Sequence, residues 1–189
     1  MVDIIKRQGR AKLKVDLLQM RKMDIFEEID QPEVVYHMTD RENLESIMES
    51  RKIKSFNDYL TFFFTNEEQA PLYIELSGAL TGRHYYGTDG IPKTAPPLIV
   101  EDTVVLKLVP QKKEKLEWYR EVIDGTKSGY ETVMTPDIQP LWDEFNNCRV
   151  VHYGDFQFDV EKVEIIELAD IYKNLSDDMA KVIEKIKKD

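Results

Sequence analysis

The sequence predicts a single α+β domain built on a strongly curved, mainly antiparallel sheet. Apolar and β-branched segments predict about six or seven short strands, and amphipathic segments predict about four or five helices. Most of these helices fall at the ends of the chain or between the early strands, which argues against a regular alternation of parallel strands and helices. A chain of 189 residues with a 42% hydrophobic share can bury the core of one such domain.

Composition narrows the class of protein. The formal net charge of -10 repels a phosphate backbone on average, although lysines and arginines cluster between Lys6 and Lys22. The favoured interpretation of that cluster is a solvated helix face of mixed charge. No apolar run approaches the roughly 20 residues of a membrane span, and no secretory h-region opens the chain, so we expect no membrane partner and a cytoplasmic location. The single cysteine, Cys148, excludes an internal disulfide, and the scattered histidines predict no metal site.

Three regions follow from the patterning. Residues 1–32 predict an N-terminal helical lead-in, with one apolar stripe from Leu13 to Ile25 and a stop at Pro32. Residues 33–170 form the main domain, and residues 171–189 a C-terminal helix whose periodic segment spans Leu175 to Lys187. The apolar stripes of both terminal helices offer a surface for a protein partner.

The main domain opens with a strand, a helix, a strand and a second helix. A β-branched and aromatic strand carries His37, and a helix from Asn43 to Lys52 follows, capped by Thr39 or Asp40. The aromatic strand from Leu60 to Thr65 is apolar enough to be buried on both faces. Asn66 then predicts the N-cap of a helix that runs through Tyr73 to about Leu80.

The remaining chain predicts a loop and further strands. Glycines and prolines predict a loop from Thr81 to Pro97, with Arg83 to Tyr86 inside it. Strands are expected at Val104–Val109, Tyr130–Met134, Arg149–Tyr153 and Val163–Leu168. Among the candidate functional residues, His37 sits at a strand end, where side chains often face a cleft. By position alone the favoured interpretation is a core histidine that donates a hydrogen bond to the backbone.

The stretch from residue 34 to residue 73 resembles a known family. Tyr36-His37-Met38-Thr39, followed by Asn43 to Met48 and then Lys52-Ile53-Lys54, is similar to the opening of the ADP-ribosyltransferase superfamily. The segment from Phe63 to Tyr73 is similar to the second element of that family. The match is greatest to the histidine–tyrosine–glutamate branch, and it implies an ADP-ribosyltransferase-like fold in which the antiparallel sheet is split.

The resemblance implies an enzyme that uses NAD as its substrate. Such an enzyme moves ADP-ribose onto a macromolecular acceptor, protein or nucleic acid, and releases nicotinamide, a chemistry found in bacterial or phage toxins and defence effectors. His37 takes the position that hydrogen-bonds the ribose, and Tyr73 the position whose ring stacks on nicotinamide. Thr39 would contact the adenosine side, and Phe64 and Thr65 would line the pocket.

The third catalytic position has two candidate alignments. In the first, Glu131 is the glutamate that stabilises the oxocarbenium-like sugar, since it lies in a strand-like segment after a glycine-rich loop. In the second, the family strand is Cys148 to Gly154, and Arg149 replaces the glutamate. The second alignment predicts a catalytically degenerate protein that binds a nucleotide or a protein partner without turnover.

Overall fold

The computed structural model describes residues 26–55, 60–86, 92–111, 118–121 and 149–188. The predictions made for Leu13 to Ile25, for the strand at Tyr130–Met134, for Glu131 and for Cys148 lie outside these residues.

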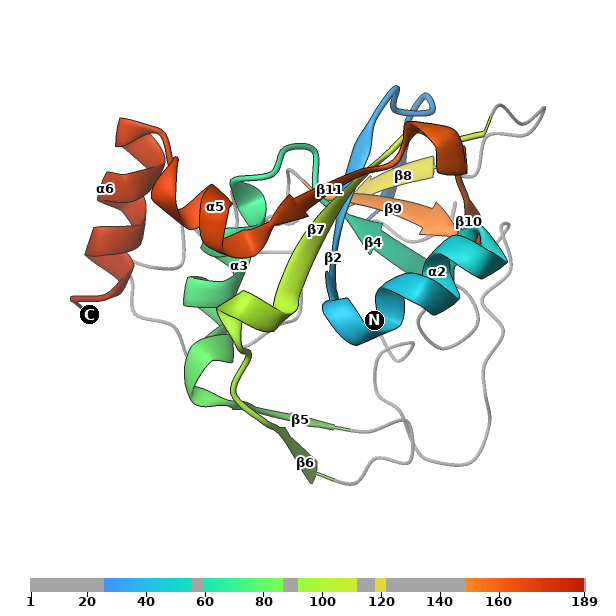
Figure 1. Cartoon of the computed structure of the whole chain (residues 1–189). Coiled ribbons are helices and arrows are strands. Elements are labelled where there is room, and N and C mark those ends of the chain that lie inside the picture. The colour runs from blue at the N-terminus through green and yellow to red at the C-terminus, as the bar shows by residue number, and fades with distance from the viewer. Residues whose placement is uncertain (1–25, 56–59, 87–91, 112–117, 122–148, 189) are drawn as a thin grey trace.

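Two antiparallel sheets make up the body of the molecule (Figure 1). The four-stranded sheet has the order β1 (Phe26–Glu28), β8 (Trp118–Glu121), β9 (Val150–Tyr153) and β4 (Leu60–Phe63). The three-stranded sheet has the order β11 (Glu164–Glu167), β7 (Thr103–Leu108) and β2 (Val35–Asp40). Two small pairs complete the strands: β10 (Phe156–Gln157) with β3 (Lys52–Ile53), and β5 (Arg83–Tyr86) with β6 (Pro92–Ala95).

Short helices connect these strands. The α-helices are α2 (Leu44–Ser50), α3 (Gln69–Ser77), α5 (Leu168–Lys173) and α6 (Asp177–Ile186). Single 3₁₀ turns are η1 (Arg41–Asn43), η2 (Ala79–Thr81), η3 (Val100–Asp102) and η4 (Val160–Lys162). Figure 1 shows α3, α5 and α6 grouped at one end of the sheets, and α2 at the other. The α+β class and the antiparallel pairing agree with the prediction from sequence, and α6 falls within the predicted Leu175–Lys187 segment.

One bridge joins the two sheets. The backbone N–H of Tyr36 donates to Phe64 O at 3.0 Å, and that of Phe64 donates to Tyr36 O at 2.8 Å. Away from this bridge, β2 pairs with β7, and β4 pairs with β9. Strand β2 and the residue that follows β4 are therefore joined by one pair of backbone hydrogen bonds, while the two strands pair within different sheets.

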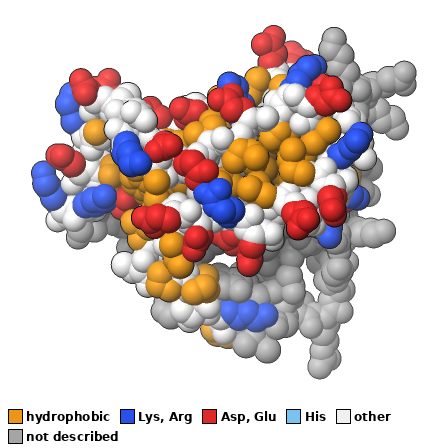
Figure 2. All heavy atoms as spheres, viewed as in Figure 1, with side chains coloured by type: hydrophobic (Ala, Val, Ile, Leu, Met, Phe, Trp, Pro, Cys, Tyr) orange, Lys and Arg blue, Asp and Glu red, His pale blue; other side chains and the backbone are white. Residues whose placement is uncertain are grey.

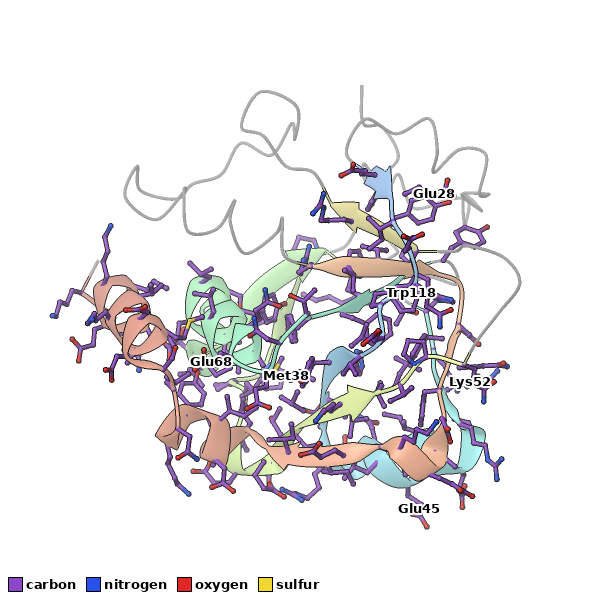
Figure 3. All side chains as sticks on the ribbon, turned by 90° about the horizontal axis from the view of Figure 1, so that it is seen from above. Glu28, Met38, Glu45, Lys52, Glu68 and Trp118 are labelled. Carbon is purple, nitrogen blue, oxygen red and sulfur yellow. The ribbon has the colours of Figure 1, made fainter. Side chains whose placement is uncertain are left out.

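Strand alternation divides the apolar core into two parts. On β2, Val35 faces a core cluster with Phe63, Leu106 and Trp118, whereas Tyr36 and Met38 face another cluster under α3 and α5. Figure 3 shows Met38 on the side of α3 and Trp118 on the other side of the strands. Because successive side chains point to opposite faces, neighbouring residues of β2 and β4 serve different cores.

The predicted N-terminal helix is wrong at its last residues, because Phe26–Glu28 form strand β1. The Phe26 ring packs edge-on against Tyr119 with centroids 6.4 Å apart, and Arg120 Nη2 donates to Glu27 Oε2 at 2.7 Å. These cross-strand contacts with β8 outweigh the weak local helical preference of the segment.

The loop predicted from Thr81 to Pro97 is also corrected, because it contains the β5–β6 hairpin. Its glycines and prolines dominate the local composition and conceal the strand pairing. One glycine is required by the backbone: Gly82 has φ +86°, and a Cβ there would lie 3.0 Å from Ala95 O. The hairpin thus begins where two backbone segments approach closely.

Helix α3 begins with reciprocal capping. Asn66 Oδ1 accepts from Gln69 N at 3.2 Å, and Gln69 Oε1 accepts from Asn66 N at 3.4 Å. This exchange satisfies backbone donors that the first helical turn leaves without partners, as in a capping box. Asn66 therefore bonds to the first residue of the helix, whereas the N-cap position falls at Glu68, two residues after the predicted cap. The helix ends at Ser77, earlier than the predicted Leu80, because Gly78 adopts the left-handed conformation.

Polar contacts attach α5 and α6 to α3. The Glu75 carboxylate, whose side chain is 8% exposed, accepts from Tyr172 Oη at 3.1 Å and pairs with Lys187 Nζ at 3.1 Å. At the other end of α6, the backbone N–H and the hydroxyl of Ser176 donate to the Glu68 carboxylate. The C-terminal helix is therefore held to α3 at both of its ends.

Replacing Glu75 with alanine should lower the free energy of unfolding by about 1–3 kcal/mol, because it removes the acceptor of the Tyr172 hydroxyl and the Lys187 ion pair. Urea titration followed by circular dichroism measures this loss. Glu184→Ala is the matched control, since that carboxylate is 73% exposed and pairs with Lys188 only at 3.9 Å. Equal effects of the two substitutions would contradict the anchoring role of Glu75.

Candidate functional site

A cavity of about 670 Å³ lies between the end of β2, helix α3 and the segment that follows β6. Its volume is within the roughly 300–1,000 Å³ of small-molecule and cofactor sites. We call it the Tyr73 pocket. Its lining residues are Met38, Asp40, Arg41, Glu42, Tyr73, Ala79, Ala95, Pro96, Pro97, Leu98, Ile99 and Asp102.

Three elements set the apolar wall of the Tyr73 pocket. Helix α3 supplies the Tyr73 ring, which packs on Phe64 with centroids 6.2 Å apart and an interplanar angle of 46°. Strand β2 supplies Met38, which belongs to the same core cluster. The segment after β6 is held by a hydrogen bond from Leu98 N to Ala79 O at 2.9 Å. The Tyr73 ring is therefore fixed by the core on one side and half-exposed to the cavity on the other.

The rim of the Tyr73 pocket is acidic. Asp40, Glu42 and Asp102 are exposed carboxylates, and Arg41 is the one cation among the described lining residues. Arg41 Nη2 donates to the Glu167 carboxylate, and this hydrogen bond raises the pKa of the guanidinium above its usual value. Figure 2 shows further acidic side chains across the face that carries α5, β11 and α2. The pocket thus favours a ligand with a positively charged or neutral aromatic part.

His37 lies on the opposite face of β2 from Met38 and the Tyr73 pocket. Its ring packs on Phe63 with centroids 5.7 Å apart, and its Nδ1 lies 3.4 Å from Phe62 O. Because a carbonyl oxygen can only accept, this contact places the imidazole proton on Nδ1. Loss of hydration lowers the pKa of His37 to about 4, against a smaller opposing effect of the Phe62 carbonyl. The ring is therefore neutral at physiological pH.

The other residues named from the sequence are distributed between helix capping and core. Thr39 Oγ1 accepts from Asn43 Nδ2 at 3.5 Å. Thr65 donates to Gln69 Oε1 from its backbone N–H at 2.7 Å and from its hydroxyl at 3.2 Å, so it belongs to the cap of α3. Phe64 is 9% exposed and lies behind Tyr73 in the core. Of the five described residues assigned to NAD, only Tyr73 lines the pocket.

The structure describes one of the two candidates for the third catalytic position. Glu131 lies outside the described residues. Arg149 immediately precedes β9, and its guanidinium carbon lies over the Phe62 ring, 5.0 Å from the centroid. This cation–π contact gives Arg149 a packing role on the four-stranded sheet. Arg149 is not among the residues that line the Tyr73 pocket.

Sequence reasoning did not single out the charged rim of the pocket. Asp40 is the last residue of β2, and Arg41 and Glu42 follow directly in η1, at the strand end where side chains tend to face a cleft. Their position at the end of a strand is the sequence feature that could have identified these residues as part of a site. Asp102 carries no comparable signal, because η3 reaches the pocket only through tertiary packing.

The described residues lack two other kinds of feature. Those residues contain no cluster of three or more histidine, cysteine, aspartate or glutamate side chains suited to a metal ion. Among their helices, none has both the length and the apolar character needed to cross a membrane.

Comparison with known proteins yields two solved structures. Thermus sp. 2.9 DarT in complex with carba-NAD+ has 14% sequence identity and a TM-score of 0.37, over 85% of this chain and 91% of that chain. Thermus sp. 2.9 DarT in complex with NAD+ has 15% identity and a TM-score of 0.36, over 84% of this chain and 90% of that chain. No family model and no curated protein matches the sequence.

Proposed function

We propose that this chain binds NAD in the Tyr73 pocket and transfers ADP-ribose to a macromolecular acceptor, with release of nicotinamide. The observation that carries the proposal is the position of Tyr73. The resemblance of residues 34–73 to ADP-ribosyltransferases assigns this tyrosine to nicotinamide stacking, and its ring lines a cavity of about 670 Å³. A flat aromatic face fixed by Phe64 suits a planar pyridinium ring.

The acidic rim fits the charge changes of this reaction. NAD carries a positive charge on its nicotinamide ring, and positive charge moves to the ribose as the glycosidic bond breaks. Carboxylates placed where that charge develops lower the barrier. Asp40, Glu42 and Asp102 supply negative charge at the rim, and Glu131 remains the proposed catalytic carboxylate.

A second candidate function is nucleotide binding without turnover. The observation that favours it is the placement of His37 and Tyr73 on opposite faces of β2, with His37 against Phe63. In the alignment that replaces the glutamate with Arg149, the catalytic set is also incomplete. Such a protein would hold NAD or ADP-ribose in the Tyr73 pocket and present the complex to a partner.

One experiment distinguishes the two candidates. The protein is incubated with NAD labelled in the adenylate moiety and with a cell lysate, and both nicotinamide release and macromolecular labelling are measured. The first proposal expects both signals in the wild type and at least about a hundredfold loss in Glu131→Gln, because a transition-state contact is removed. Calorimetric binding of NAD without either signal supports the second candidate. Absence of binding and of turnover overturns both.

The class of acceptor follows from fractionating the labelled lysate. Treatment with protease or with nuclease shows whether the label is attached to protein or to nucleic acid. A role as a bacterial or phage toxin or defence effector predicts that expression of the wild type slows growth of a bacterial host, whereas expression of Glu131→Gln does not. Equal growth with both proteins would contradict that role.

A further inference from the structure

Arg41 occupies a distinctive position in the Tyr73 pocket. It is the first residue of η1, directly after β2, and its side chain lines the cavity. The Nη2 atom donates to the carboxylate of Glu167, at the end of β11, and lies 3.5 Å from the carbonyl oxygen of Glu101. The guanidinium therefore contacts the side chain of Glu167 and the backbone of Glu101, and neither residue lines the pocket.

The charge of the rim creates a specific requirement for any dinucleotide. The diphosphate of NAD or ADP-ribose carries two negative charges, and it would meet the carboxylates of Asp40, Glu42 and Asp102. A cation is therefore needed to bring a diphosphate into this cavity. Arg41 is the one cation among the described lining residues, and its planar guanidinium matches a phosphate with two parallel hydrogen bonds.

The ion pair that now holds Arg41 is easily exchanged. The Arg41 and Glu167 side chains are each 44% exposed, and ion pairs in such surroundings contribute little to stability. Release of Arg41 from Glu167 would leave both groups in contact with water. A diphosphate can thus replace Glu167 as the partner of Arg41 without disturbing the core.

We propose that Arg41 is the diphosphate-binding residue of the Tyr73 pocket and that Glu167 holds it in the ligand-free protein and competes with the ligand. This inference rests on the proposed binding of NAD in the same pocket. Arg41 then determines the affinity for the diphosphate, and Glu167, a negative residue outside the pocket lining, weakens binding of an anionic ligand.

Calorimetry with ADP-ribose tests both parts. We expect Arg41→Gln to weaken binding about 10- to 100-fold, the effect of losing hydrogen bonds to a charged group. Glu167→Gln should strengthen binding several-fold, because the competitor of the diphosphate is removed. The double variant should bind like Arg41→Gln alone, since Glu167 acts only through Arg41. Adenosine, which lacks the diphosphate, should bind equally to all four proteins.

A matched variant controls for the general effect of removing a surface cation. Lys107→Gln breaks an exposed ion pair with Glu164, whose atoms are 2.7 Å apart, outside the pocket lining. Its affinity for ADP-ribose should equal that of the wild type. A loss as large as that of Arg41→Gln would overturn the assignment to Arg41, because it would show only a general charge effect.

The failures of the two proposals are distinguishable. If wild-type protein binds ADP-ribose and Arg41→Gln binds it equally well, the role of Arg41 is overturned and the pocket assignment stands. If Glu167→Gln leaves affinity unchanged while Arg41→Gln weakens it, the competition is overturned. If the wild type binds neither NAD nor ADP-ribose, the proposed function and this inference fall together.

Discussion

The free energy of unfolding should fall by about 3 kcal/mol between pH 6.5 and pH 4 because of His37. Burial lowers the pKa of this histidine from 6.5 to about 4 in the folded protein. Well above pH 6.5 the ring is neutral in both states and its titration contributes nothing. As the pH falls through this window, the unfolded chain takes up a proton that the folded protein excludes, so the unfolded state gains stability.

The measurement is urea unfolding at several pH values in the wild type and in His37→Gln, which does not titrate. The wild-type curve should fall more steeply between pH 6.5 and pH 4. Below this window both proteins should lose stability together. Hydrogen bonds from Ser55 N and Lys52 lower the pKa of Asp155 from 3.8 in the folded protein, so the unfolded state binds this proton more readily as the pH falls. Parallel curves within the window would show that His37 is hydrated in the folded protein.

The placement of His37 shows which features of the site the sequence predicts and which it does not. The order of strand, helix, strand and helix between residues 34 and 73 is local information, carried by β-branched residues, caps and apolar spacing. The structure confirms this order and adds the short strand β3, which begins at Lys52, where the first helix was predicted to end. Strand alternation also predicts that His37 and Val35 share a face. The sequence does not reveal which face of β2 is covered by α3. That choice places Tyr73 beside Met38 and away from His37.

Sequence patterns predict the walls of the Tyr73 pocket less well, because these walls depend on contacts between distant parts of the chain. Pro96 and Pro97 end the segment whose prolines and glycines predicted only a loop. The chain there becomes a wall because the backbone N–H of the next residue, Leu98, donates to Ala79 O across the end of α3. Phe26–Glu28 likewise form a strand only because β8 is there to pair with them. Both cases depend on long-range contacts, whose energy exceeds the local preferences that a sequence displays.

Replacing Tyr73 with leucine should weaken NAD binding about 10- to 100-fold, the range for loss of one aromatic stacking contact. Leucine keeps apolar bulk against Phe64 but lacks the flat face, whereas Tyr73→Phe keeps the ring that packs at 6.2 Å from Phe64. Tyr73→Phe should therefore bind NAD with nearly wild-type affinity. Calorimetry gives the affinities, and thermal unfolding confirms that both variants are folded.

The ligand itself supplies the decisive control for Tyr73. ADP-ribose lacks the nicotinamide ring, so Tyr73→Leu should leave its affinity close to that of the wild type if the tyrosine stacks on nicotinamide. An equal loss for NAD and ADP-ribose would instead place the Tyr73 ring against the adenosine or the ribose. Read together with Arg41→Gln, which should weaken both ligands, the two substitutions fix the direction in which the dinucleotide lies. Arg41 marks the diphosphate and Tyr73 the nicotinamide end.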